Sequence, residues 1–338
     1  MRNTIIDNLR GICMLGVIGI HIGSLALAPN NFILYLLLEI LSRYSVPSFF
    51  FISGYGLACT DKGLLSGSRL NYIDFMKKRL RGCYHLYFMV ILLWFYASYP
   101  LWRQLLRIII HKSIPFMLVL LFIFQLAFNW WTTHPGLNTA GWSVIAKNFF
   151  DYRLNYLPLH YLLIFMSGGL AACYWEKFIA LLRRYSAMVC MIFAASMAWD
   201  VQSCYEAVTV KGYTLIDLAN TYHQLSPQGL CYTVGSLLFF CLALDWLERK
   251  AQSEGSLAKP FYKAISILSA YSMLIYFVHP LLLDWLSSAY NHFGIIMTVK
   301  KVALSYVLLV LGSLALSILL TKAFEKCSMA KLLFTGKR

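Results

Sequence analysis

Charged side chains are scarce in this chain of 338 residues, and the acidic ones are the scarcest. Only 13% of the residues are charged, with 14 Asp and Glu against 29 Lys and Arg. A soluble domain of ordinary composition has roughly 25% charged residues, so this scarcity argues against a soluble protein. The net charge of +15 therefore indicates basic loops beside a membrane, and we expect no nucleic-acid partner.

Closely spaced cysteine pairs are also missing. The nine cysteines are scattered, mostly within apolar runs, and no CxxC occurs. This pattern predicts neither a metal site nor a disulfide framework. We do not expect a cleavable signal peptide either, because the first apolar run lacks a small-residue cleavage site and many similar runs follow it.

Long apolar runs make up most of the chain, and 60% of its residues are hydrophobic. Runs of about this length can cross a hydrocarbon core of ~30 Å. They lie near 11–29, 32–58, 82–99, 113–131, 156–174, 185–200, 230–247, 264–286 and 302–322. The basic bias of the intervening segments predicts the cytoplasmic side. Those basic segments are 59–81, 174–185, 248–263 and 322–338.

Nine crossings cannot leave both termini in the cytoplasm, because an odd number exchanges sides. We therefore expect a tenth pass between 82 and 155, at 99–112 or at 135–150, as a span or a re-entrant piece. The predicted fold is all-α: a polytopic integral membrane bundle of about ten transmembrane helices with cytoplasmic termini. It forms one membrane domain over 1–338 without a soluble domain.

The first apolar run carries the most informative pair, Arg10 and His21. Eleven residues separate them, which is within about 20° of three full helical turns, so both project from one face about 16 Å apart. His21 then lies near the middle of the bilayer, where an ionisable side chain is costly and indicates a functional site. The alternative is a histidine bonded to a neighbouring helix. Asp7, three residues before Arg10, either pairs with it as an interfacial anchor or supports a substrate entrance.

Two further stretches have two interpretations each. Ser53 and Gly54 end the second run with small residues, which favour close helix packing or a broken helix end. A basic cluster, Lys77–Arg81, precedes the third run. Lys78 and Arg81 share a helix face, and the cluster either contacts anionic lipid headgroups or clamps the phosphates of a cofactor such as coenzyme A.

Taken together, these stretches resemble the acyltransferase 3 family of integral membrane acyltransferases. The matching pieces are Asp7…Arg10 with His21, Phe50–Tyr55, the basic cluster, Ser272–Pro280 and a terminal Glu325. The resemblance implies ten core helices and an acyl-CoA donor, such as acetyl-CoA, on the cytoplasmic side. It also implies transfer of an acyl group, usually acetyl, to a hydroxyl of a cell-surface sugar or related acceptor.

The family's motifs transfer residue by residue. The Arg/Lys-x10-His motif falls on Arg10 and His21, and the Ser-Gly motif on Ser53 and Gly54. The coenzyme A motif Arg-x-x-Arg falls on Lys78-Arg79-Leu80-Arg81, where Lys in the first place keeps the charge but loses the bidentate fork. The resemblance thus implies catalytic roles for His21, Arg10 and Asp7. It implies donor binding by Lys78, Arg79 and Arg81, with Ser53 and Gly54.

Acyl transfer to a hydroxyl also requires a base, or a nucleophile that carries the acyl group, and the near-neutral pKa of an imidazole suits a base. We therefore predict that His21 is the base. Tyr276, His279 and His160 are candidate acceptor contacts; ordinary packing is the alternative for both histidines.

The leading hypothesis is a membrane O-acyltransferase in a bacterial cytoplasmic (inner) membrane. Its expected partners are acyl-CoA, a carbohydrate or lipid-linked acceptor and membrane lipids, without a metal. A transporter or flippase of a polar or glycolipid solute is the second hypothesis, with His21 and His279 as proton-linked or substrate-contacting sites, and a scaffold is a poor third. Cleavage of an acyl thioester separates the first two.

Overall fold

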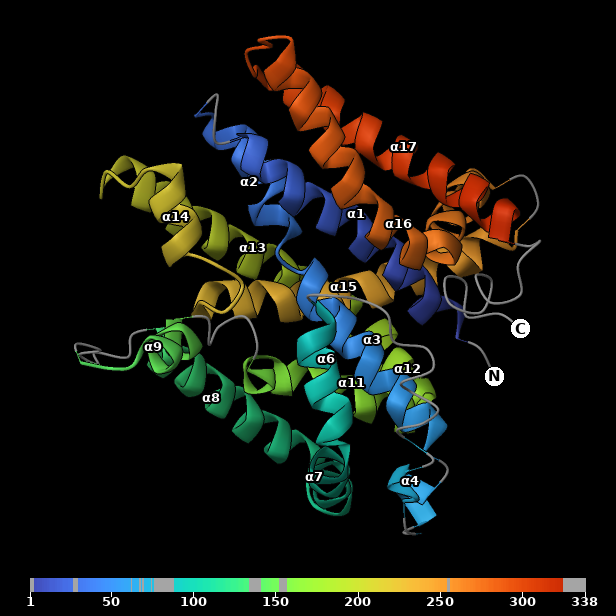
Figure 1. Cartoon of the computed structure of the whole chain (residues 1–338). Coiled ribbons are helices and arrows are strands. Elements are labelled where there is room, and N and C mark those ends of the chain that lie inside the picture. The colour runs from blue at the N-terminus through green and yellow to red at the C-terminus, as the bar shows by residue number, and fades with distance from the viewer. Residues whose placement is uncertain are drawn as a thin grey trace. The chain divides into compact units, whose positions relative to one another are not determined.

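The computed structural model describes residues 3–26, 30–61, 63–66, 68, 70–73, 75, 88–133, 141–151, 157–253 and 256–324. Every secondary-structure element within these ranges is helical, which confirms the predicted all-α class (Figure 1). The chain folds as two compact units, each built from separate stretches of sequence. Action of 1–338 as one acyltransferase domain stays a prediction.

The first unit comprises Met1–Phe49, Ile179–Gln224 and Cys231–Arg338, and the second comprises Phe50–Phe178 and Leu225–Leu230. The helices run, in chain order, α1 (Thr4–Ala26), α2 (Phe32–Leu38), η1 (Ile40–Ser42), α3 (Ser45–Thr60), α4 (Gly63–Ser66), α6 (Phe88–Ala97), α7 (Tyr99–His111), α8 (Ile114–Thr133), α9 (Val144–Asp151), η2 (Pro158–Tyr161), α11 (Leu162–Cys173), α12 (Trp175–Arg184), α13 (Ser186–Thr209), α14 (Leu215–Thr221), α15 (Pro227–Ala251), α16 (Ala258–His292) and α17 (Val299–Phe324).

Seven helices or helix runs in the described part are long and apolar enough to cross a membrane, and eight if one bent pair counts as a span. Where a tenth pass was expected, α7 has 13 residues and α9 has 8. Both are shorter than the ~20 residues that a spanning helix needs. A helix is therefore present at the candidate segment 99–112, but it is short. The count of ten and the side of the termini stay predictions.

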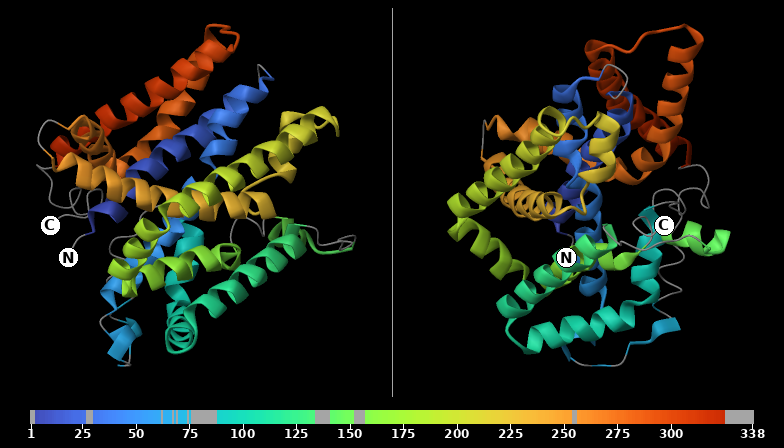
Figure 2. Two further views of the ribbon diagram at one scale, coloured as in Figure 1. Left: turned by 180° about the vertical axis from the view of Figure 1, so that it is seen from behind. Right: turned by 90° about the vertical axis from the view of Figure 1, so that its left-hand side faces the viewer.

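In the first unit, α1, α2, α16 and α17 enclose one apolar core. Both views in Figure 2 keep the orange and red α16 and α17 beside the blue α1. The buried members are Met14, Val17, Ile18, Ile22, Leu34, Leu38, Ile275, Val302 and Leu309. Because the first apolar run supplies four of these side chains, α1 is the centre of this unit.

A second core of the first unit joins α2 and η1 to α13 and α14. Its buried members are Tyr35, Ile40, Cys204, Ala207, Leu215 and Leu218. Helix α14 begins with a capping box, in which Thr214 and Asp217 bond each other's backbone amides. The hydroxyl of Thr214, 2.6 Å from Oδ2 of Asp217, and the amide of Thr214 both donate to this carboxylate and hold its pKa below its usual range, because they favour its charged form.

An ion pair lies inside this unit, between Arg43 and Asp200. Both side chains are 1% exposed, and Nη1 of Arg43 lies 2.9 Å from Oδ1 of Asp200. The same guanidinium also donates to the backbone carbonyl of Tyr222. A charge buried among apolar helices is tolerated only when it is paired and hydrogen-bonded. The pair therefore joins the turn before α3 to α13.

In the second unit, α3 and α11 cross with almost no space between their backbones. A Cβ placed on Gly54 would lie 2.0 Å from the carbonyl oxygen of Phe165, and one on Gly168 would lie 2.0 Å from that of Phe51. Only glycine fits at either position. Stacked rings surround this crossing, including Phe95 on Phe165 at 4.1 Å between centroids.

Buried amides of α8 hold the start of α11. Gln125 is fully buried; its Nε2 donates to the carbonyl of Leu159 at 2.8 Å, and its Oε1 accepts from the amide of Leu163 at 3.0 Å. The first amides of a helix have no partner within the helix, so a side chain that reaches them stabilises its start. One glutamine thus fixes the η2–α11 junction against α8.

At the other end of the second unit, Asp61 anchors α7. Nε of Arg103 lies 2.6 Å from its carboxylate, and the hydroxyl of Tyr99 donates to it at 3.2 Å. A tyrosine hydroxyl is protonated at neutral pH, so it can donate this bond to Asp61.

We predict that Arg43→Met lowers the stability of the protein by about 3–5 kcal/mol, because Asp200 would remain buried without its partner. The double variant Arg43→Met/Asp200→Leu should regain most of this loss. The matched control is Arg249→Met, since Arg249 is 52% exposed and pairs with Asp245; it should change stability by less than about 1 kcal/mol. Thermal unfolding in detergent measures all three. Equal losses for Arg43→Met and Arg249→Met would contradict the buried-pair account.

A second prediction concerns the α3–α11 crossing. Gly54→Ala should cost about 1–3 kcal/mol, because its methyl group would meet backbone that cannot move aside. Gly56→Ala, one half-turn further along α3, is the control, because a Cβ there meets no atom within 4 Å. The midpoint of thermal unfolding should fall for the first variant only. A similar fall for both would show that space at the crossing is not limiting.

Candidate functional site

The candidate site lies in the first unit, where helices α1 and α16 pack against each other. The two helices run in the same direction. A Cβ on Gly11 would lie 2.7 Å from the carbonyl oxygen of Ile265 and 3.0 Å from the amide of Ser269. The hydroxyl of Ser269 donates to the backbone carbonyl of Asp7. Ten residues beyond Gly11 is His21, and ten residues beyond Ser269 is His279. Equal steps along parallel helices predict that these two histidines meet.

The two imidazoles do meet. Their ring centroids lie 5.0 Å apart with the planes inclined by 55°, and the ring of Tyr276 lies 5.8 Å from that of His279. His21 is exposed, whereas His279 is 1% exposed. The structure thus joins the opening apolar run to the His-Pro segment, an encounter that the sequence did not predict. We call His21 and His279 the histidine pair, and Tyr276 lies beside it.

The hydrogen bond of His279 defines its tautomer. Nδ1 lies 2.9 Å from the carbonyl oxygen of Ile275. A carbonyl oxygen can only accept, so Nδ1 carries the proton and Nε2 keeps a lone pair. Nε2 is buried and finds no hydrogen-bond partner among the described residues. Pro280, inside the same helix, has no amide hydrogen to donate to the carbonyl of Tyr276.

Asp7 and Arg10 form the predicted pair at the start of α1. Nη1 of Arg10 lies 3.3 Å from Oδ1 of Asp7, and their side chains are 44% and 15% exposed. Helix α1 is continuous from Thr4 to Ala26, so Arg10 precedes His21 by the expected three turns on one face. The guanidinium is accessible to an anionic group.

Three other predicted site residues, His160, Ser53 and Gly54, belong to the second unit. His160 belongs to the second unit, where it is 1% exposed, contacts Phe128, and has its Nδ1 3.1 Å from Oδ1 of Asn129. It therefore packs in a buried amide network, and its role as an acceptor contact stays a prediction. Gly54 lies at the α3–α11 crossing, and Ser53 is its partly buried neighbour. Their predicted role in donor binding stays a prediction.

Some predicted residues lie outside the part that the structure describes. They are Lys78, Arg79 and Arg81 of the basic cluster, and Glu325. Their roles in donor binding rest on the sequence alone. Among the described residues, no group of three or more His, Cys, Asp and Glu side chains could hold a metal ion.

Sequence reasoning missed two features of the first unit. The ion pair of Arg43 and Asp200 was detectable, because Arg43 interrupts the second apolar run, and an ionisable residue there indicates a function or a partner. The second feature is a pocket of about 370 Å³ formed by α15 and α16. Its lining includes Lys259 and Lys263 of the basic segment 248–263. The local sequence pattern does not reveal that these residues line a pocket.

Comparison with known proteins gives a result at the level of the family. The sequence model of the acyltransferase 3 family, described as an acyltransferase domain, matches residues 3–81 and 81–322. Neither curated proteins nor solved structures give a match. Because this match covers nearly the whole chain and the described helices suit a membrane, the chain belongs to the acyltransferase 3 family and is a membrane acyltransferase.

Proposed function

We propose that the protein transfers an acyl group, acetyl in the simplest case, from cytoplasmic acyl-CoA to a hydroxyl of a cell-surface sugar, glycolipid or related acceptor. The observation that carries this proposal is the histidine pair, three turns beyond Arg10 on α1. It supplies a base inside a helix bundle, with a cation nearer the helix start. The setting would be a bacterial inner membrane.

In this mechanism His21 is the general base. It takes the proton of the acceptor hydroxyl as that oxygen attacks the thioester carbonyl carbon. The new carbon–oxygen bond forms, the carbon–sulfur bond breaks, and coenzyme A leaves as a thiolate. His21 returns the proton to that thiolate, so the base is regenerated. Its exposure leaves the imidazole accessible to both substrates.

His279 and Tyr276 hold the acceptor. With Nδ1 of His279 committed to Ile275, Nε2 can only accept a hydrogen bond, which suits a hydroxyl of a sugar. Such a bond orients the acceptor beside His21. Tyr276 is half-buried on the same helix and adds a ring and a hydroxyl. The family's donor motif assigns Lys78 and Arg81 to the donor phosphates.

The first test compares wild type with His21→Ala in detergent-purified protein. Removal of a general base should lower acetyl-CoA turnover by about 10²- to 10⁴-fold while acetyl-CoA binding is retained. His292→Ala is the control, because His292 is an exposed histidine on α16. Lys78→Ala/Arg81→Ala should instead lose binding. A well-folded wild type that neither binds nor cleaves acetyl-CoA would overturn the proposal in favour of transport.

A second test separates the two histidines. In membranes that contain natural acceptors, His279→Ala should lose transfer of radiolabelled acetyl groups to those acceptors by at least tenfold. Hydrolysis of acetyl-CoA by water should persist, because His21 remains. His21→Ala should lose both reactions. If His279→Ala loses hydrolysis as completely as His21→Ala, then His279 does more than bind the acceptor.

A further inference from the structure

We infer that the pocket between the end of α15 and the start of α16 binds a phosphate group. Its volume is about 370 Å³, and its lining includes Lys259 and Lys263 of α16 with Gln252 beyond α15. A pocket of this size can hold a phosphorylated moiety. No role has been assigned to these residues above, and they are distinct from the basic cluster Lys77–Arg81.

The two lysines make the pocket cationic. They are exposed and lie one helical turn apart, so their ammonium groups share a face. Neither forms an ion pair with a carboxylate of the described residues. Ammonium groups without a local counter-ion attract phosphate oxygens as strong point charges. Lys259 lies in the first turn of the 35-residue helix α16, where the helix dipole also favours an anion.

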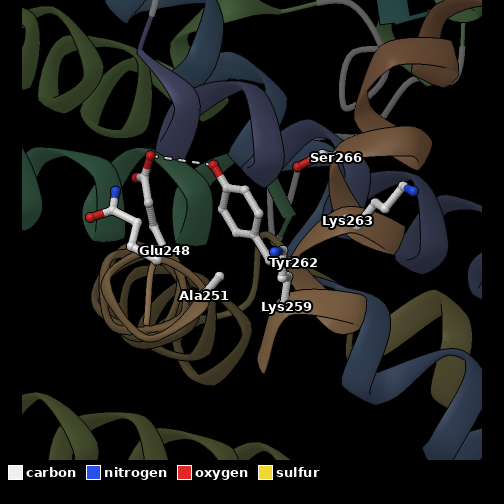
Figure 3. Close-up of a pocket in the computed structure, with 7 residues that line it drawn as sticks. Glu248, Ala251, Lys259, Tyr262, Lys263 and Ser266 are labelled. Carbon is white, nitrogen blue, oxygen red and sulfur yellow. Dashed lines mark hydrogen bonds between the residues drawn. The ribbon is translucent and has the colours of Figure 1, made fainter. Parts of the chain in front are cut away.

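One carboxylate lines the pocket, and its bonds point it away from a ligand. Oε1 of Glu248 accepts from the hydroxyl of Thr4 at 2.5 Å and from that of Tyr262 at 3.3 Å. Figure 3 shows the hydroxyl of Tyr262 directed at Glu248, and Lys263 extended away from that carboxylate. Two hydroxyl donors therefore hold Glu248 beside α1. The lysines stay available to an anion.

The pocket is aligned with the histidine pair. Thr4 and Tyr262 flank it on α1 and α16, and His21 and His279 each follow seventeen residues later. Seventeen residues of helix span about 25 Å. Acyl-CoA is elongated, with its phosphates at one end and the thioester at the other. The geometry therefore fits a donor that places one phosphate group of its nucleotide end in the pocket, which leaves the other phosphates of coenzyme A to other residues; this assignment rests on the proposed function.

A phospholipid headgroup offers the same phosphate chemistry, so the test has two arms. In the first arm, isothermal titration measures coenzyme A binding to the full chain in phosphatidylcholine nanodiscs. In the second, thermal unfolding measures the stabilisation gained when phosphatidylglycerol is added to those nanodiscs. Each arm compares wild type with Lys259→Gln/Lys263→Gln.

The control variant is Lys300→Gln/Lys322→Gln, which removes two exposed lysines of α17 and so gives the same change in net charge. We expect Lys259→Gln/Lys263→Gln to weaken coenzyme A binding by at least tenfold, and the control by less than twofold. Glu248→Gln should tighten binding, because it removes the one negative charge among the described lining residues.

Each outcome is decisive. Loss of coenzyme A binding by the pocket variant alone assigns the pocket to the donor. Unchanged coenzyme A binding with loss of the phosphatidylglycerol effect assigns it to a lipid headgroup. No difference from the control in either arm overturns the phosphate site. If wild type binds no coenzyme A at all, the proposed function fails, while the lipid arm still tests the pocket.

Discussion

The close parallel packing of α1 on α16 is the contact on which the rest of the first unit depends. Gly11 permits the approach, and the hydroxyl of Ser269 fastens α16 to the backbone of α1. Parallel helices in van der Waals contact keep their register over many turns. This contact near the start of α1 therefore sets the register that brings His279 to His21 and Tyr262 close to Thr4.

Polar groups inside the bundle follow one rule in both units. Arg43 is buried against Asp200, and Gln125 is buried against the start of α11. In an apolar interior each of these groups would be costly alone, so each is matched with a partner on another element. Some buried polar atoms have no such partner among the described residues, including Nε2 of His279 and the hydroxyls of Ser45 and Thr233. In the proposed mechanism, Nε2 of His279 is the atom of this group that accepts from the substrate hydroxyl.

Much of the architecture could be predicted from the sequence. Scarce charge and long apolar runs predict a helical membrane protein, and the periodicity of α1 places Arg10 and His21 on one face. The pairing of Asp7 with Arg10 also follows from local spacing, as the structure confirms. The count of ten crossings stays a prediction, because the apolar residues at 99–112 do not show from the sequence alone that their helix, α7, ends after 13 residues.

The sequence by itself determined the fold class, the face of α1 that carries Arg10 and His21, and the family motifs. These features depend on spacing, charge and hydropathy, which act within a few turns of one helix. The tertiary structure decided which distant segments meet. It places His279 beside His21, His160 beside Asn129, and Lys259 and Lys263 in the lining of one pocket. The physical reason is that helix packing depends on shape and small residues far apart in the chain, and no single run contains that information.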